Sequence, residues 1–195
     1  MFRRLTAPSY AEPAIGFRSR KAAQLCAWFA VRSGGTIEKL KLAKLIYLAE
    51  REHLLRFEEP MLFDEMYSLP HGPICSSVLN GINGVIHEEI WDDYMTRNGN
   101  IIVAIRNFCR DDLDDLSEED IEIANKLWEQ FGSYTSSQLR NYTHEHCKEY
   151  VELTDGRMPI SYQEILSAIG SDRADDVEAE VAEMRRAHKT LAQMS

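Results

Sequence analysis

Apolar residues recur at helical spacing along most of the chain, and this pattern predicts a mainly helical protein. Residues 36–57 are apolar almost all round in the middle of the segment, so we expect this helix to lie at the centre of the core. Capping-box sequences at Ser117, Thr135 and Ser161 indicate where three later helices begin. The predicted helices cover residues 19–32, 36–57, 73–82, 117–131, 135–143, 161–169 and 171–195.

A change from helical to alternating spacing predicts a short β element. Residues 90–95 and 101–105 flank Asn98-Gly99, a dipeptide that favours a hairpin turn because both residues accept positive φ. Residues 60–69 predict a further extended stretch, which is followed by a turn at residues 70–73. We therefore expect the mainly α (α+β) class, with a compact helical domain, a short β-hairpin or small antiparallel sheet, and a C-terminal amphipathic helix.

The sequence predicts three parts: an N-terminal arm over residues 1–18, a domain over residues 19–170, and a C-terminal helix over residues 171–195. Apolar positions in the last part are spaced alternately three and four apart, which is the pattern of a narrow helix seam. A helix of this kind is not stable alone, so its seam must dock on the domain, on a second copy or on another protein such as a protease. The seam residues are Ala174, Val177, Val181, Met184, His188 and Leu191.

Composition limits the classes of partner. The formal net charge is −10, with +7 on residues 1–56 and −17 on residues 57–195. This balance argues against broad binding of nucleic acid, which needs a basic face. No apolar run approaches the roughly 20 residues that cross a bilayer. No apolar segment follows the charged N-terminus, so we expect a cytoplasmic protein with reduced thiols and no contact with membranes.

Candidate chemistry is sparse. The chain has no Walker loop, GxGxxG segment or nucleophile motif, and we expect neither a cofactor nor a catalytic residue. Residues 144–147, His-Glu-His-Cys, are the most ligand-like cluster, but a structural zinc site needs four ligands and no second cluster stands out. We therefore expect no metal. A metal-dependent enzyme using these residues and His71 is kept as a weaker alternative.

Five segments together resemble one family, the SocA/Panacea antitoxin domain, which includes phage-associated GepA-like proteins. Residues 41–49 resemble its KLQKLLYFA helix, and residues 60–65 resemble its PLFDE stretch. His71-Gly72-Pro73-Ile74 stands where the family has YGPV. Residues 137–144 resemble its ELSELTH helix, and residues 159–169 resemble its closing PIS helix. The segments follow the family's order within residues 19–170. The chain departs from the pattern at Pro70 and His71, and it lacks the family's tryptophan soon after the Thr-His pair.

The resemblance implies a non-enzymatic role: the antitoxin of a bacterial or prophage type II toxin–antitoxin pair, which neutralises its cognate toxin by direct complex formation. One alternative is a proteolytic adaptor or scaffold that delivers a bound protein to a protease. A DNA-binding autorepressor is a weaker alternative, supported only by the basic segment over residues 1–56.

A rigid turn with aromatic neighbours suits protein contacts, and this reasoning selects the partner-binding residues. The first choices are Tyr67, Leu69, His71 and Pro73 around the predicted turn, and the second choices are Trp91 and Tyr94 of the predicted hairpin.

Overall fold

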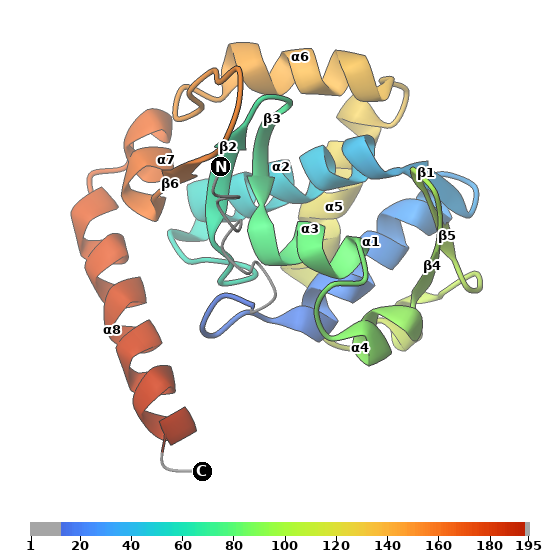
Figure 1. The fold of residues 1–195 in the computed structure, drawn as a ribbon, viewed down its shortest axis with the longest axis horizontal. Coiled ribbons are helices and arrows are strands. Elements are labelled where there is room, and N and C mark those ends of the chain that lie inside the picture. The colour runs from blue at the N-terminus through green and yellow to red at the C-terminus, as the bar shows by residue number, and fades with distance from the viewer. Residues whose placement is uncertain (1–12, 194–195) are drawn as a thin grey trace, which may run out of the picture.

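The computed structural model describes residues 13–193, and Figure 1 shows their arrangement. The described chain contains eight α-helices and two small antiparallel sheets, which confirms the mainly α (α+β) class. The helices are α1 (Ser19–Arg32), α2 (Lys39–Phe57), α3 (Ser76–Ile82), α4 (Glu88–Asp92), α5 (Glu118–Phe131), α6 (Ser136–His146), α7 (Tyr162–Ile169) and α8 (Ala174–Gln193), with a short 3-10 turn over Arg110–Asp112. The strands are β1 (Thr36–Glu38), β2 (Met66–Leu69), β3 (Gly72–Cys75), β4 (Met95–Asn98), β5 (Ile101–Ala104) and β6 (Met158–Ile160).

Helix α2 forms the centre of the core, as its apolar pattern predicts. Leu42, Leu45 and Ile46 have no exposed surface. Helices α1, α5, α6 and α7 and strand β3 all contact α2, and Figure 1 shows it running through the middle of the molecule. The middle of this helix, residues 42–50, is therefore buried on every side.

Local capping chemistry sets the start of three helices. Ser117, Thr135 and Ser161 each accept a hydrogen bond from the third amide of the following helix, and the side chain at that position returns the contact. These reciprocal bonds satisfy amides that have no partner within the helix. The three capping boxes predicted from the sequence are thereby confirmed.

The two sheets have the orders β1-β5-β4 and β3-β2-β6. The hairpin around Asn98-Gly99 is confirmed: Asn98 pairs with Ile101, and Gly99 has a φ of +58°. The second sheet is built on the β2–β3 hairpin, and β6 pairs with the other edge of β2.

Three local predictions are wrong because pairing or packing overrides local preference. Thr36 lies in β1 and does not cap α2, since Ile37 pairs with Ile102 of β5. Pro73 lies in β3 and does not begin a helix. An edge strand tolerates proline because one side of the strand needs no N–H donor. Trp91 lies in α4, not in a strand.

The first half of the C-terminal seam docks on the domain. Ala174, Val177 and Val181 are buried, and α8 packs against α7. Met184 is 39% exposed, but the neighbouring Arg185 still donates a hydrogen bond to the Asp64 carbonyl oxygen of the main body. The C-terminal end of α8 extends away from the main body in Figure 1. The three-part division stays a prediction, and residues 1–12 of the expected arm lie outside the described residues. Within residues 13–193, no helix is long and apolar enough to cross a membrane.

Candidate functional site

The β2–β3 hairpin has one face in the core and one face toward a groove. Cross-strand partners point to the same side of a sheet, and side chains alternate along each strand. Met66 and Ser68 are buried with their partners Cys75 and Pro73. Tyr67 pairs with Ile74 on the opposite face, which lines the groove.

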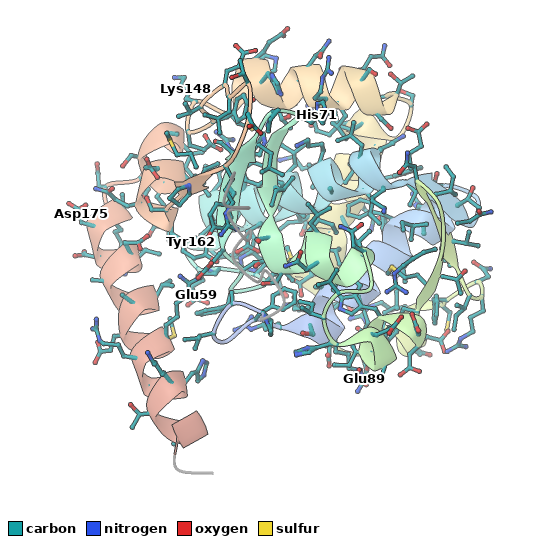
Figure 2. All side chains as sticks on the ribbon, in the orientation of Figure 1. Glu59, His71, Glu89, Lys148, Tyr162 and Asp175 are labelled. Carbon is teal, nitrogen blue, oxygen red and sulfur yellow. The ribbon has the colours of Figure 1, made fainter. Side chains whose placement is uncertain are left out.

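The turn of this hairpin is tight and projects beside α6. Leu69 pairs with Gly72, so Pro70 and His71 alone form the loop. Pro70 fixes φ near −65°, which excludes turn types that need a positive φ at this position. Gly72 follows with a φ of +93°, a conformation that favours glycine. His71 is thereby held exposed at the tip (Figure 2).

Two hollows meet over the groove face of the hairpin, and together we call them the hairpin groove. The first has a volume of about 320 Å³ and reaches Tyr67 and Arg157. The second has a volume of about 360 Å³ and reaches Lys44 and His71. The two hollows are adjacent, because three apolar residues line both of them: Leu69, Ile74 and Leu79. The groove is thus apolar in the middle and has charged side chains toward each end: Arg157 and Asp155 line the first hollow, and Lys39, Lys44 and Glu38 line the second.

Lys44 of α2 is fully buried at the second hollow. Its Nζ donates to the Pro73 carbonyl oxygen at 2.7 Å, and this is its single hydrogen bond to residues 13–193. No carboxylate of the described chain forms an ion pair with Nζ. Burial lowers the pKa of Lys44 to about 7. The amine therefore satisfies a backbone carbonyl oxygen on the edge strand β3. Burying the charged amine to make this hydrogen bond carries a considerable desolvation cost.

Gly72 lies where α2, β3 and α6 converge. A Cβ at this position would lie 3.0 Å from Lys44 Nζ, 3.0 Å from Thr143 Oγ1 and 3.1 Å from His144 Cδ2. His144 Nε2 is buried and has no hydrogen-bond partner among residues 13–193, and burial followed by the nearby Lys44 lowers the pKa of this imidazole. Three of the segments that carry the family resemblance meet at this point.

The stretch over residues 60–65 supports the groove from below. Asp64 Oδ1 accepts hydrogen bonds from the amides of Glu65 and Ser77, and Oδ2 accepts one from Val78. The carboxylate thereby caps the first turn of α3. The Tyr162 hydroxyl donates to the Asp64 carbonyl oxygen at 2.9 Å, which ties the closing segment of the resemblance to this stretch.

Replacing Asp64 with asparagine should destabilise the protein by about 1–3 kcal/mol, because an amide nitrogen cannot accept a hydrogen bond and leaves a buried amide unpaired. Burial raises the pKa of Asp64 to about 6, so the measurement belongs at pH 7 or above, where the carboxylate is ionised. Urea unfolding measures the effect, and Glu65→Gln serves as the exposed neighbouring control. Equal stability of Asp64→Asn and wild type would contradict this assignment.

The partner-binding residues predicted from the sequence divide into two groups. Tyr67 and Leu69 line the hairpin groove, and His71 stands exposed at its end. Pro73 is buried and contributes its carbonyl oxygen to Lys44. Trp91 is 0% exposed and Tyr94 is 7% exposed, and both pack in the core. We drop the last two from the proposed surface because they have almost no area to offer a partner.

Sequence reasoning missed Lys44, although a signal was present. A single charge in the middle of a helix that is apolar all round has to be buried. The partner of that charge is 29 positions away along the chain, so its role needs the fold.

The ligand-like cluster does not converge. Cys147 ends α6 as its C-cap, and burial raises the pKa of its thiol to about 12, while His146 is exposed. Over residues 13–193, no group of three His, Cys, Asp or Glu side chains could hold a metal ion.

Comparison with known proteins gives a family. No curated protein and no solved structure matched the chain. Residues 42–149, more than half of the sequence, match the family described as "Antitoxin SocA-like, Panacea domain". The matched range includes Lys44, the hairpin with Gly72, and His144 of α6, while the closing segment at residues 159–169 lies beyond it. The chain therefore belongs to the antitoxin SocA-like, Panacea domain family.

Proposed function

We propose that this protein is the antitoxin of a bacterial or prophage type II toxin–antitoxin pair, and that it neutralises a toxin protein by direct complex formation. The family match is the observation that carries the proposal. The hairpin groove supports it further, since an apolar trough beside an exposed, rigid turn offers the contact area that protein recognition uses.

The charge of the chain favours a basic toxin. The net charge is −10, and the excess of carboxylates lies in residues 57–195. A toxin that acts on nucleic acid carries a basic surface, and opposite charge speeds the encounter of two proteins. The rate of complex formation should therefore fall as salt is added.

Replacing Leu69 with glutamate should abolish neutralisation, because it places a charge in the apolar middle of the groove. The assay is growth rescue on co-expression with the product of the neighbouring gene, followed by pull-down of the complex. Leu55→Glu makes the same chemical change at a leucine that is 50% exposed and does not line the groove. Circular dichroism of both variants checks that the fold is retained.

Three outcomes of this assay are informative. Failure of the wild-type chain to rescue growth would contradict the antitoxin function. Rescue by Leu69→Glu as complete as by Leu55→Glu would move the toxin surface away from the groove. Rescue that disappears in a protease-deficient host would favour the adaptor alternative, for which the exposed outer part of α8 around Met184 offers a second surface.

A further inference from the structure

The hairpin groove contains a buried cation with unused hydrogen-bonding capacity. An ammonium group has three N–H donors, and Lys44 Nζ uses one of them on the Pro73 carbonyl oxygen. A buried ammonium without an anion is costly, whereas a carboxylate that supplies charge and acceptors offsets much of that cost. Lys44 thus has the chemistry of a site that an incoming anion would complete.

The surroundings of Lys44 are short of negative charge. Its charged or titratable neighbours are Arg140 and His144 of α6, Cys75 of β3, and Cys147 after α6. The burial of both thiols raises their pKa, so they remain neutral near pH 7. Glu38 lines the same hollow, but its carboxylate accepts a hydrogen bond from the Ser136 hydroxyl.

The shape of the groove favours an extended polypeptide as the occupant. Leu69, Ile74 and Leu79 line both hollows, so a ligand can run along the hairpin face from Arg157 to Lys44 over an apolar floor. Apolar side chains of a partner can bury against this floor. Lys44 has no exposed surface in the free protein, so an acidic side chain reaches its amine only when the side chains that line the second hollow shift on binding. A dianion such as phosphate fits poorly, because one ammonium supplies few donors and Glu38 is nearby.

We propose that the hairpin groove binds an extended segment of the partner toxin, and that a carboxylate of this segment pairs with the Lys44 ammonium beside Gly72. The inference rests on the proposed function for the identity of the partner. The lysine site itself is a property of this chain and can be tested without the partner.

The local acidic contact is compatible with a toxin that is basic overall. Long-range attraction depends on net charge, while the contact inside the groove depends on one desolvated pair.

The pair of Lys44 with a carboxylate also gives binding a pH dependence. The pKa of free Lys44 is about 7, and a carboxylate held against Nζ raises it. Affinity should then fall as the pH rises above 7, because free Lys44 loses the proton that the complex requires.

The first experiment compares affinities for an inactive variant of the neighbouring gene product by calorimetry. Lys44→Met keeps the length of the side chain and removes the charge, and it should weaken binding at least about tenfold near pH 6. Lys39→Met is the matched control, since Lys39 lines the same hollow and donates to Asn83 Oδ1. This control should change affinity less than about threefold. Equal affinity of Lys44→Met and wild type would overturn the proposal.

The second experiment uses the wild-type chain alone, so it also holds if Lys44→Met fails to fold. Lysine side-chain NMR follows the titration of Lys44 in sodium acetate and in sodium chloride of equal ionic strength. Acetate should raise the pKa of Lys44 by about half a unit relative to chloride and leave Lys39 unchanged. No difference between the two salts, or a response to phosphate alone, would overturn the carboxylate site. A missing complex with the neighbouring gene product, beside a positive acetate titration, would instead contradict the proposed function.

Discussion

Replacing Gly81 with alanine should destabilise the protein by about 3 kcal/mol or more, although helix propensity favours alanine by about 1 kcal/mol. Gly81 lies in α3, and a Cβ built on it would overlap the indole ring of Trp91. Trp91 has no exposed surface and therefore has nowhere to move. The close approach of the α3 backbone to this ring is thus possible only with glycine. Urea or thermal unfolding measures the loss.

A second substitution separates this overlap from a general intolerance of α3. Trp91→Leu leaves a cavity and should itself cost about 2–4 kcal/mol. When it is combined with Gly81→Ala, the new methyl group occupies part of the space that the ring leaves. The double variant should therefore be no less stable than Trp91→Leu alone. Its loss of stability is then smaller than the sum of the two single losses, and the difference is the coupling energy between the two positions. Additive losses would mean that Gly81 is needed for another reason.

Features of the fold that depend on neighbours in the chain are readable from the sequence. The three capping boxes each use residues three positions apart, and the apolar stripes of α1, α5 and α7 repeat within a few turns. The errors occur where a distant residue decides the outcome. Ile37 becomes a strand residue by pairing with Ile102, and Trp91 turns inward because Gly81 leaves room for its ring.

The candidate site likewise has one part that can be predicted from local sequence and one part that depends on the fold. Pro70, His71 and Gly72 predict a turn from local chemistry, but not that it joins two strands. Tyr67 and Leu69, chosen as neighbours of that turn, line the groove, and their contact with a partner stays a prediction. Lys44 has no local signature for its role. Its importance comes from β3 and α6 meeting on α2, which brings Pro73 to its amine.

Buried charges recur at the positions where the resembling segments meet. Lys44 binds the edge of β3, Asp64 caps α3, and Glu50 binds the loop before β2. None of the three forms an ion pair with another residue of the described chain, and each satisfies backbone groups instead. Burial has opposite effects on the two kinds of charge, since it lowers the pKa of Lys44 and raises that of Asp64 and Glu50. The stability of this fold should therefore depend on pH well inside the neutral range.

The largest of these effects is expected at Glu50, and Glu50→Gln should reveal it as a stability difference that changes with pH. Glu50 is fully buried on α2 and accepts hydrogen bonds from the amides of Met61 and Leu62, at 3.1 Å and 2.9 Å. Burial raises its pKa to about 8 from an ordinary value of 4.5. The folded protein therefore holds a proton there that the unfolded chain has lost between these two pH values. Wild-type stability should fall by up to about 1.4 kcal/mol for each pH unit as the pH rises through this range.

Glutamine cannot titrate, and its single carboxamide oxygen leaves one of the two amides unpaired. Glu50→Gln should therefore be less stable than wild type near pH 5, by about 1–3 kcal/mol, and should approach or exceed it near pH 8. Urea unfolding at a series of pH values measures the difference, and other titrating groups such as Asp64 largely cancel because both proteins contain them. Glu52→Gln removes a partly exposed carboxylate of the same helix and should not reproduce the slope. A difference between Glu50→Gln and wild type that stays constant from pH 5 to pH 8 would mean that Glu50 is ionised throughout, held by the two amides more strongly than burial opposes it.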